Sequence, residues 1–105
     1  MRFLISWSIP NKNRVQCLNI FGNMTPDDDV KDSGPDIQVI GRWHLLAGSG
    51  GVCVVETENA SALNSWVLNW TPLCEISVEP VVEDASARSS IQSKQYFVSN
   101  DTNES

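Results

Sequence analysis

Three residues near the middle of the chain, Arg42, His44 and Glu56, have side chains suited to acid–base chemistry or to anion binding. An imidazole such as that of His44 titrates near neutral pH, and a guanidinium such as that of Arg42 can bind a carboxylate through two parallel hydrogen bonds. Glu56 could orient either of these groups. The three residues therefore form a candidate ligand-binding site for an anion or a carboxylate.

The same three residues also have a purely structural interpretation. Arg42 and Glu56 could form an ion pair across two neighbouring strands, beside a hydrogen-bonded His44 at an interface. The sequence offers no evident nucleophile or second base to accompany them, which favours the structural interpretation. We therefore assign no catalytic residue.

Four tryptophans in a chain of 105 residues, Trp7, Trp43, Trp66 and Trp70, form a second candidate ligand-binding group. They could line an aromatic pocket between a sheet and its helices. The simpler interpretation is a hydrophobic core, because Trp66 and Trp70 have helical spacing and Trp7 and Trp43 have strand spacing. Large rings pack less completely than aliphatic side chains, so a cavity near them remains a reasonable expectation.

Residues 41–57 read as two strands joined by a tight turn, and they carry Arg42, His44 and Glu56. Aromatic and β-branched residues on both sides of the turn favour strands. The turn itself, Gly48-Ser49-Gly50-Gly51, supplies the glycines that a tight reversal needs. It is not a phosphate-binding loop, because no lysine and no helix follow it.

The first part of the chain predicts a strand and a helix. Residues 2–9 alternate between apolar and polar side chains, as in a half-buried strand. Asn11 then caps a predicted helix over about residues 12–21. The apolar side of this helix comprises Val15, Leu18 and Phe21, with Cys17 and Met24 beside them.

An acidic segment with two prolines, residues 23–36, is predicted to be a solvated loop. Its aspartates, Asp27, Asp28, Asp29 and Asp32, do not have the spacing of a calcium-binding loop, and no glutamate occupies the bidentate position. We therefore expect no metal site here.

A second helix follows Asn59, which is its predicted N-cap, and it ends before Pro72. Its apolar residues follow the i, i+3, i+4, i+7 pattern of an amphipathic helix. They are Leu63, Trp66, Val67 and Trp70.

The last strand is predicted over residues 73–83, where Pro80 indicates an edge strand or a bulge. With a strand over residues 37–47, the order is β-α-β-β-α-β, a ferredoxin-like α+β fold. It places two helices on one face of a four-stranded antiparallel sheet of order 4-1-3-2. Residues 1–83 form this domain. Residues 84–105 form a polar extension, with an apolar cluster at residues 96–98 and a short helix near residues 85–92.

Alternation along the strands assigns side chains to the two faces of the sheet. If Arg42 pairs with Glu56, then Arg42, His44 and Glu56 lie on the face away from the helices, and Trp7 and Trp43 lie on the helix face. A haem site would need His44 among the tryptophans, which this assignment opposes. Because one helix layer leaves the other face bare, we expect a homodimer through that face.

The composition excludes several classes of partner. A net charge of −6 disfavours nucleic acid and anionic membranes, and no apolar run is long enough to span a bilayer. Three cysteines without a C-x-x-C pair exclude a conventional zinc site and make a disulfide framework unexpected. We expect small buried thiols in a soluble, acidic, cytoplasmic protein without a cofactor.

Several segments together resemble a small bacterial family known as domain of unknown function 3303. They are residues 3–10, Gly41-Arg42-Trp43-His44, Gly48-Ser49-Gly50-Gly51, Glu56-Thr57, and Leu63 with Trp66 and Trp70. The resemblance covers about residues 1–83. It implies a ferredoxin-like domain of the dimeric α/β-barrel type and no particular activity. Haem-degrading and antibiotic-biosynthesis monooxygenases have related architectures, which is an analogy of fold.

Two hypotheses of function follow. The first is a small homodimeric protein that binds a small molecule or a protein partner at a site including Arg42, His44 and Glu56. The second is a monooxygenase-like enzyme with an aromatic pocket between sheet and helices. A cavity between two stacked sheets would favour the first, and one between sheet and helices the second.

Overall fold

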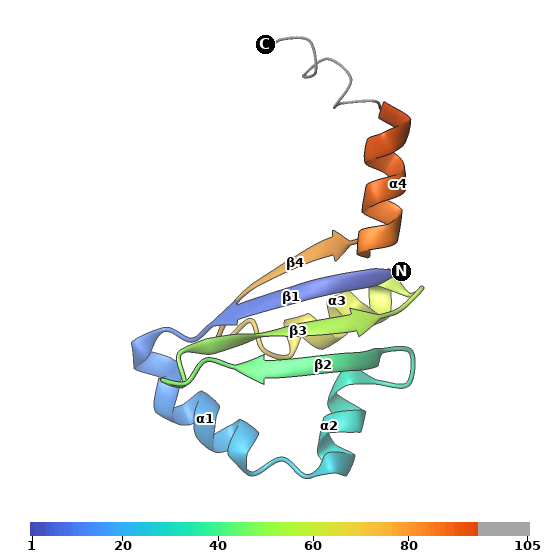
Figure 1. Ribbon diagram of the computed structural model, residues 1–105. Helices are drawn as coiled ribbons and strands as arrows, with labels where there is room; N and C mark the ends of the chain where they lie inside the picture. The colour runs from blue at the N-terminus through green and yellow to red at the C-terminus, as the bar shows by residue number, and fades with distance from the viewer. Residues whose placement is uncertain (95–105) are drawn as a thin grey trace, which may run out of the picture.

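The computed structural model describes residues 1–94 and is an α+β domain (Figure 1). The predicted cluster at residues 96–98 lies outside the described residues. In chain order, the elements are β1 (Arg2–Ser8), the 3-10 helix η1 (Asn11–Asn13), α1 (Arg14–Gly22), α2 (Pro26–Ser33), β2 (Gln38–His44), β3 (Gly50–Glu56), α3 (Ala60–Leu68), β4 (Glu75–Val81) and α4 (Asp84–Lys94).

The four strands form one antiparallel sheet in the order β2-β3-β1-β4, which reads β4-β1-β3-β2 from the opposite edge. Ile5 of the central strand β1 pairs with Cys53 of β3 and with Val78 of β4. β4 is an edge strand, as Pro80 indicated, because an edge position tolerates a residue without a backbone N–H. The predicted α+β class and antiparallel sheet are confirmed, and the arrangement is compatible with a ferredoxin-like fold.

Helix α3 packs on the sheet through the side that its spacing predicted. Leu63 and Trp66 are buried against strand residues that include Ile5 and Val55. Burying side chains of this size contributes about 1.5–3 kcal/mol each. Asn59 caps the helix as predicted, since its Oδ1 accepts a hydrogen bond of 3.0 Å from the Ala62 N–H.

The prediction of a loop over residues 23–36 is wrong, because most of this segment forms helix α2. Thr25 and Asp28 make a capping box: Thr25 Oγ1 accepts from the Asp28 N–H, and the Asp28 carboxylate accepts from the Thr25 N–H. The hydrogen bond from the Thr25 backbone N–H, and to a lesser extent the Thr25 side chain, lowers the pKa of Asp28. Pro26 fits the first turn, where its missing N–H costs nothing. Pro26 and the aspartates that follow it, which indicated a loop, therefore start a helix.

Helix α1 also differs from its prediction. It begins at Arg14 after the 3-10 turn, and Asn11 Oδ1 accepts a hydrogen bond from the Arg14 side chain instead of capping the helix. Val15, expected on the apolar side, is 74% exposed, whereas Cys17 is buried. The predicted apolar side is therefore wrong at Val15, whereas Leu18 and Phe21 do face the space between the helix and the sheet.

A β-bulge in β2 overturns the predicted assignment of faces. The pairing shifts between Val39 and Gly41, so that Arg42 pairs with Cys53 and His44 with Gly51. Paired residues of antiparallel strands project from the same face, and Cys53 belongs to the core beneath the helices. The predicted Arg42–Glu56 pairing is wrong. Arg42 and His44 therefore face the helices.

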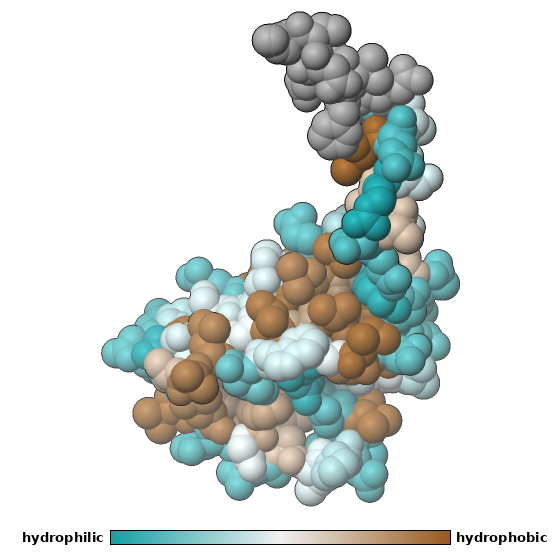
Figure 2. Space-filling view, viewed as in Figure 1, coloured by the Kyte–Doolittle hydropathy of each residue, from teal (hydrophilic) through white to brown (hydrophobic). Residues whose placement is uncertain are grey.

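Trp43 consequently lies on the face away from the helices, where it is 59% exposed. It lies across Gly41, and a Cβ added to Gly41 would be 2.3 Å from the indole ring. A side chain at position 41 would displace this ring. Apolar residues gather on the sheet face seen in Figure 2. We call Leu4, Ile40, Trp43, Val52 and Val54 the outer-face patch.

Helix α4 confirms the short helix expected near residues 85–92, and it extends away from the sheet beyond β4 (Figure 1). None of its residues is buried. Over residues 1–94, no helix combines the length and the apolar character that crossing a membrane requires.

The close approach of β3 to its neighbours predicts a strict requirement for glycine at position 51. A Cβ added to Gly51 would lie 2.3 Å from the Trp43 carbonyl oxygen and 2.5 Å from the Trp7 ring. We expect Gly51→Ala to lower the free energy of unfolding by about 1–3 kcal/mol, measured by urea denaturation. Gly22→Ala is the control, because nothing lies within 4 Å of its added Cβ. Equal stability of the two variants would contradict this packing.

Candidate functional site

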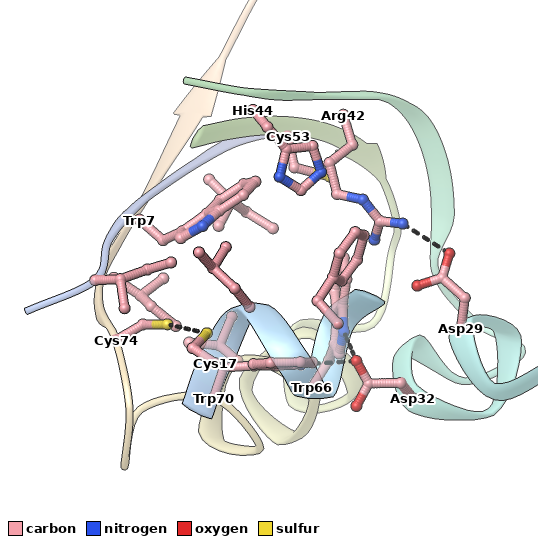
Figure 3. A pocket seen from close by; sticks show the side chains of 16 residues that line it. Trp7, Cys17, Asp29, Asp32, Arg42, His44, Cys53, Trp66, Trp70 and Cys74 are labelled. Carbon is pink, nitrogen blue, oxygen red and sulfur yellow. Dashed lines mark hydrogen bonds and ion pairs between the residues drawn. The ribbon is translucent and has the colours of Figure 1, made fainter. Parts of the chain in front are cut away.

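A cavity of about 100 Å³ lies between the sheet and helices α1, α2 and α3 (Figure 3). Its wall is mostly apolar and aromatic. Trp7, Trp66 and Trp70 line it, together with Phe21 of α1. The structure therefore gathers three of the four predicted tryptophans around one space. We call this space the pocket.

Arg42 brings a positive charge to the pocket wall. Its Nη2 donates a hydrogen bond of 2.8 Å to Asp29 Oδ2, and its side chain is only 21% exposed. The guanidinium also lies over the Phe21 ring, 5.0 Å from the ring centroid, which is a favourable cation–π distance. Arg42 is therefore held by α1 and α2, not by Glu56.

His44 lies near the mouth of the pocket between two aromatic rings. Its ring centroid is 5.5 Å from that of Trp7 in an edge arrangement and 4.9 Å from that of Phe21. Within residues 1–94, no hydrogen bond or ion pair of its side chain is found, and the residue is exposed. Its ring nitrogens can therefore meet a ligand.

Asp32 of α2 orders the aromatic wall. Its Oδ2 accepts hydrogen bonds from Trp66 Nε1 at 2.9 Å and from Trp70 Nε1 at 2.7 Å. Its Oδ1 accepts from Asn69 Nδ2 at 2.9 Å. One carboxylate therefore fixes the orientation of two indoles. Figure 3 shows both bonds.

Sequence reasoning missed Asp29 and Asp32, because it placed both in a solvated loop. The signal that could have identified them is the pattern Thr25-x-x-Asp28, which marks a helix start. Once the segment is a helix, positions 29 and 32 lie on one side of it, one turn apart. Both carboxylates then point into the pocket.

Two of the predicted site residues lie outside the pocket. Trp43 belongs to the outer-face patch. Glu56 does not line the pocket. Its carboxylate accepts from the amino group of Met1 at 2.6 Å and from Arg2 Nε at 3.1 Å, and these bonds lower the pKa of Glu56. The structure therefore separates Glu56 from Arg42 and His44.

The three cysteines are buried free thiols, as predicted, and all of them line the pocket. Burial raises the pKa of Cys53, and burial together with a hydrogen bond to Cys17 raises the pKa of Cys74 to about 12. Neither Cys53 nor Cys74 is therefore activated as a nucleophile at neutral pH. The described residues contain no group of three or more His, Cys, Asp or Glu placed to hold a metal ion.

The sequence was compared with known families and proteins. A family model described as "Domain of unknown function (DUF3303)" matches residues 1–95. The chain belongs to the DUF3303 family. This match extends past residue 83 and includes α4, so it is longer than the motifs alone indicated. Among curated proteins, no match to this sequence is found.

The pocket of this DUF3303 protein combines apolar walls with a few polar groups near its mouth, which is typical of small-molecule sites. The Arg42 guanidinium keeps N–H groups beyond the one donated to Asp29, and His44 can donate or accept. These groups could bind an acceptor atom of a ligand whose apolar part contacts the tryptophans.

The hydrogen bonds that Asp32 accepts predict that its removal lowers the free energy of unfolding. Asp32→Ala would leave the indole N–H groups of Trp66 and Trp70 without their acceptor, which costs about 1–3 kcal/mol for a partly buried donor. We expect a lower midpoint of urea unfolding and a changed tryptophan emission spectrum of the folded protein. Asp27→Ala, an exposed position of the same helix, is the control and should cost no more than about 1 kcal/mol. Identical behaviour of both variants would show that the Asp32 bonds contribute nothing.

Proposed function

We propose that this DUF3303 protein binds a small, flat, largely apolar molecule in the pocket between the sheet and the helices. The observation that carries the proposal is the convergence of Trp7, Trp66 and Trp70 with Arg42 and His44 on one cavity. Its volume, about 100 Å³, compares with the ~150 Å³ of an engineered protein cavity that binds benzene. The enclosed part therefore suits about one ring.

The charges around the pocket favour a neutral ligand. One arginine and two aspartates, Arg42, Asp29 and Asp32, give the wall a formal charge of +1 − 2 = −1 with His44 neutral. An anionic ligand would compete with Asp29 for Arg42 and would be repelled by both carboxylates. A carbonyl or hydroxyl oxygen needs only the remaining N–H groups of Arg42 or the ring of His44. A quinone or phenol thus fits better than the carboxylate that the residue types alone suggested.

A second candidate is catalysis in the same pocket by a monooxygenase-like reaction. Two observations favour it: the pocket lies between the sheet and the helices, which is the position expected for such an enzyme, and His44 lies beside Trp7 and Phe21 in its wall. The imidazole could exchange a proton with a phenolic ligand held against the indoles. Oxygen uptake in the presence of bound ligand would distinguish this reaction from binding alone.

The assembly that we propose is a homodimer formed through the outer-face patch. Trp43 is 59% exposed and Ile40 is 45% exposed on the sheet face that no helix of residues 1–94 covers. Large apolar residues gathered on a sheet face are typical of a protein interface. A second copy would supply the same patch, as two-fold symmetry requires.

Ligand binding is tested by a thermal-shift screen with tetramethyl-1,4-benzoquinone, a single-ring quinone, and with phenols, flavin, haem and benzoate. We expect a quinone or a phenol to raise the melting temperature of the wild-type chain more than benzoate does, because the pocket wall is formally negative. His44→Ala should remove at least half of this rise, whereas Glu56→Gln, outside the pocket, should leave it unchanged. A rise of equal size in His44→Ala would exclude His44 from the site, and no rise with any probe would overturn the proposal.

The dimer is tested by analytical ultracentrifugation at micromolar concentration. We expect the wild-type chain to sediment as a dimer and Trp43→Glu to sediment as a folded monomer, because a buried unpaired charge opposes association. Val15→Glu is the control, since Val15 is also apolar and is 74% exposed but lies on α1. A monomeric wild-type chain would refute the proposed interface.

A further inference from the structure

We propose that Cys17 and Cys74 form a reversible disulfide that fastens helix α1 to the sheet, which makes this pair a redox modification site in the pocket wall. The proposal concerns the thiols alone and does not depend on a ligand.

The two sulfurs are already in contact. The distance between Cys17 Sγ and Cys74 Sγ is 3.6 Å, and both residues are buried in one cluster with Ile9 (Figure 3). A disulfide bond is about 2.05 Å long, so the sulfurs need to approach by only about 1.5 Å. Cys53 belongs to the other core cluster, with Val55 and Trp66. The structure therefore selects one pair among the three thiols.

A small oxidant can reach the pair because both cysteines line the pocket. With a peroxide as oxidant, one sulfur attacks a peroxide oxygen, the O–O bond breaks, and a sulfenic acid forms. The second sulfur then displaces the sulfenic oxygen as water and forms the S–S bond. With hydrogen peroxide, two thiols and one peroxide give one disulfide and two waters.

The bond would matter because α1 has few other attachments. In the described chain, its side-chain hydrogen bonds to neighbouring segments are those of Arg14 to the Ile9 carbonyl and to Asn11 Oδ1, and that of the preceding Asn13 to the Leu73 carbonyl. At its other end, Phe21 lies under the Arg42 guanidinium. Val15 and Ile20 are exposed, so little apolar burial holds the helix. A bond between residues 57 positions apart would remove much freedom from the unfolded chain. It would also fix Phe21, which α1 contributes to the pocket wall.

The reaction should be slow at neutral pH. Burial and the hydrogen bond to Cys17 raise the pKa of Cys74 to about 12, so its thiolate is scarce. The thiolate is the reactive form in both peroxide attack and disulfide exchange. The pair would therefore stay reduced under reducing conditions and respond to sustained oxidation.

The experiment treats the purified full-length chain with hydrogen peroxide and then maps the peptides. We expect a mass loss of two hydrogen atoms, a Cys17–Cys74 peptide, and a melting temperature higher by at least about 5 °C, all reversed by dithiothreitol. Amide hydrogen exchange in residues 14–22 should slow in the oxidised chain.

Two variants distinguish a Cys17–Cys74 disulfide from oxidation at any of the three cysteines. Cys53→Ala should keep the peptide and the rise in melting temperature, and Cys74→Ala should lose both. The peptide map of the peroxide-treated wild-type chain decides the question even if a variant does not fold. Three free thiols after treatment, a link to Cys53, or a link between two chains would each overturn the proposal.

Discussion

The pocket of this DUF3303 protein depends on one irregularity, the bulge between Val39 and Gly41 in strand β2. Side chains alternate between the two faces of a sheet, so one unpaired residue exchanges the faces of everything after it. Here the exchange moves Arg42 and His44 under the helices and moves Trp43 to the open face. The absence of a side chain on Gly41 lets the Trp43 ring lie across the strand. Without this shift, the pocket would have no cation and the outer face would lose its largest apolar group.

Helix α2 is the second support of the site, and it acts through its charges. Its capping box starts the helix at Thr25. Asp29 and Asp32 lie one turn apart on this helix. The Asp29 carboxylate accepts a hydrogen bond from Arg42 on β2, and the Asp32 carboxylate accepts hydrogen bonds from Trp66 of α3 and from Trp70 just after it. Hydrogen bonds to a charged acceptor are stronger than neutral ones, and these bonds order aromatic rings that packing alone would orient less strictly. An acidic segment thus becomes the element that joins the sheet edge to α3.

Helix α1 closes the third side of the pocket with much weaker attachment. It exposes several apolar residues. Its hydrogen bonds lie near its start, at Asn13, Arg14 and Cys17, and its end is held by the contacts of Phe21 with Arg42 and His44. An element with little apolar burial opens at lower free energy than the core does. Helix α1 therefore influences both the access of molecules to the pocket and the oxidation state of the Cys17–Cys74 pair.

Much of the fold could be predicted from local sequence patterns. The strands, the cap at Asn59, the buried side of α3 and the edge position marked by Pro80 all follow from spacing and from single-residue conformational preferences. Helix α2 was predictable in principle, because its capping box lies within four consecutive residues. It was missed because prolines and aspartates are frequent in loops as well as at helix starts.

The sequence by itself determined the α+β class, the aromatic content and the burial of the thiols, since each depends on local periodicity or composition. The predicted turn at residues 48–51 is displaced, because residues 45–49 join β2 to β3 while Gly50 and Gly51 belong to β3. Only the tertiary structure decided which face Arg42, His44 and Trp43 occupy and that Glu56 pairs with Arg2 instead. The physical reason is that a bulge is set by pairing with a neighbouring strand, and the sequence pattern of one strand does not contain that register. The same holds for the bonds of Asp32 and for the contact of Cys17 with Cys74, which join segments 34–57 positions apart.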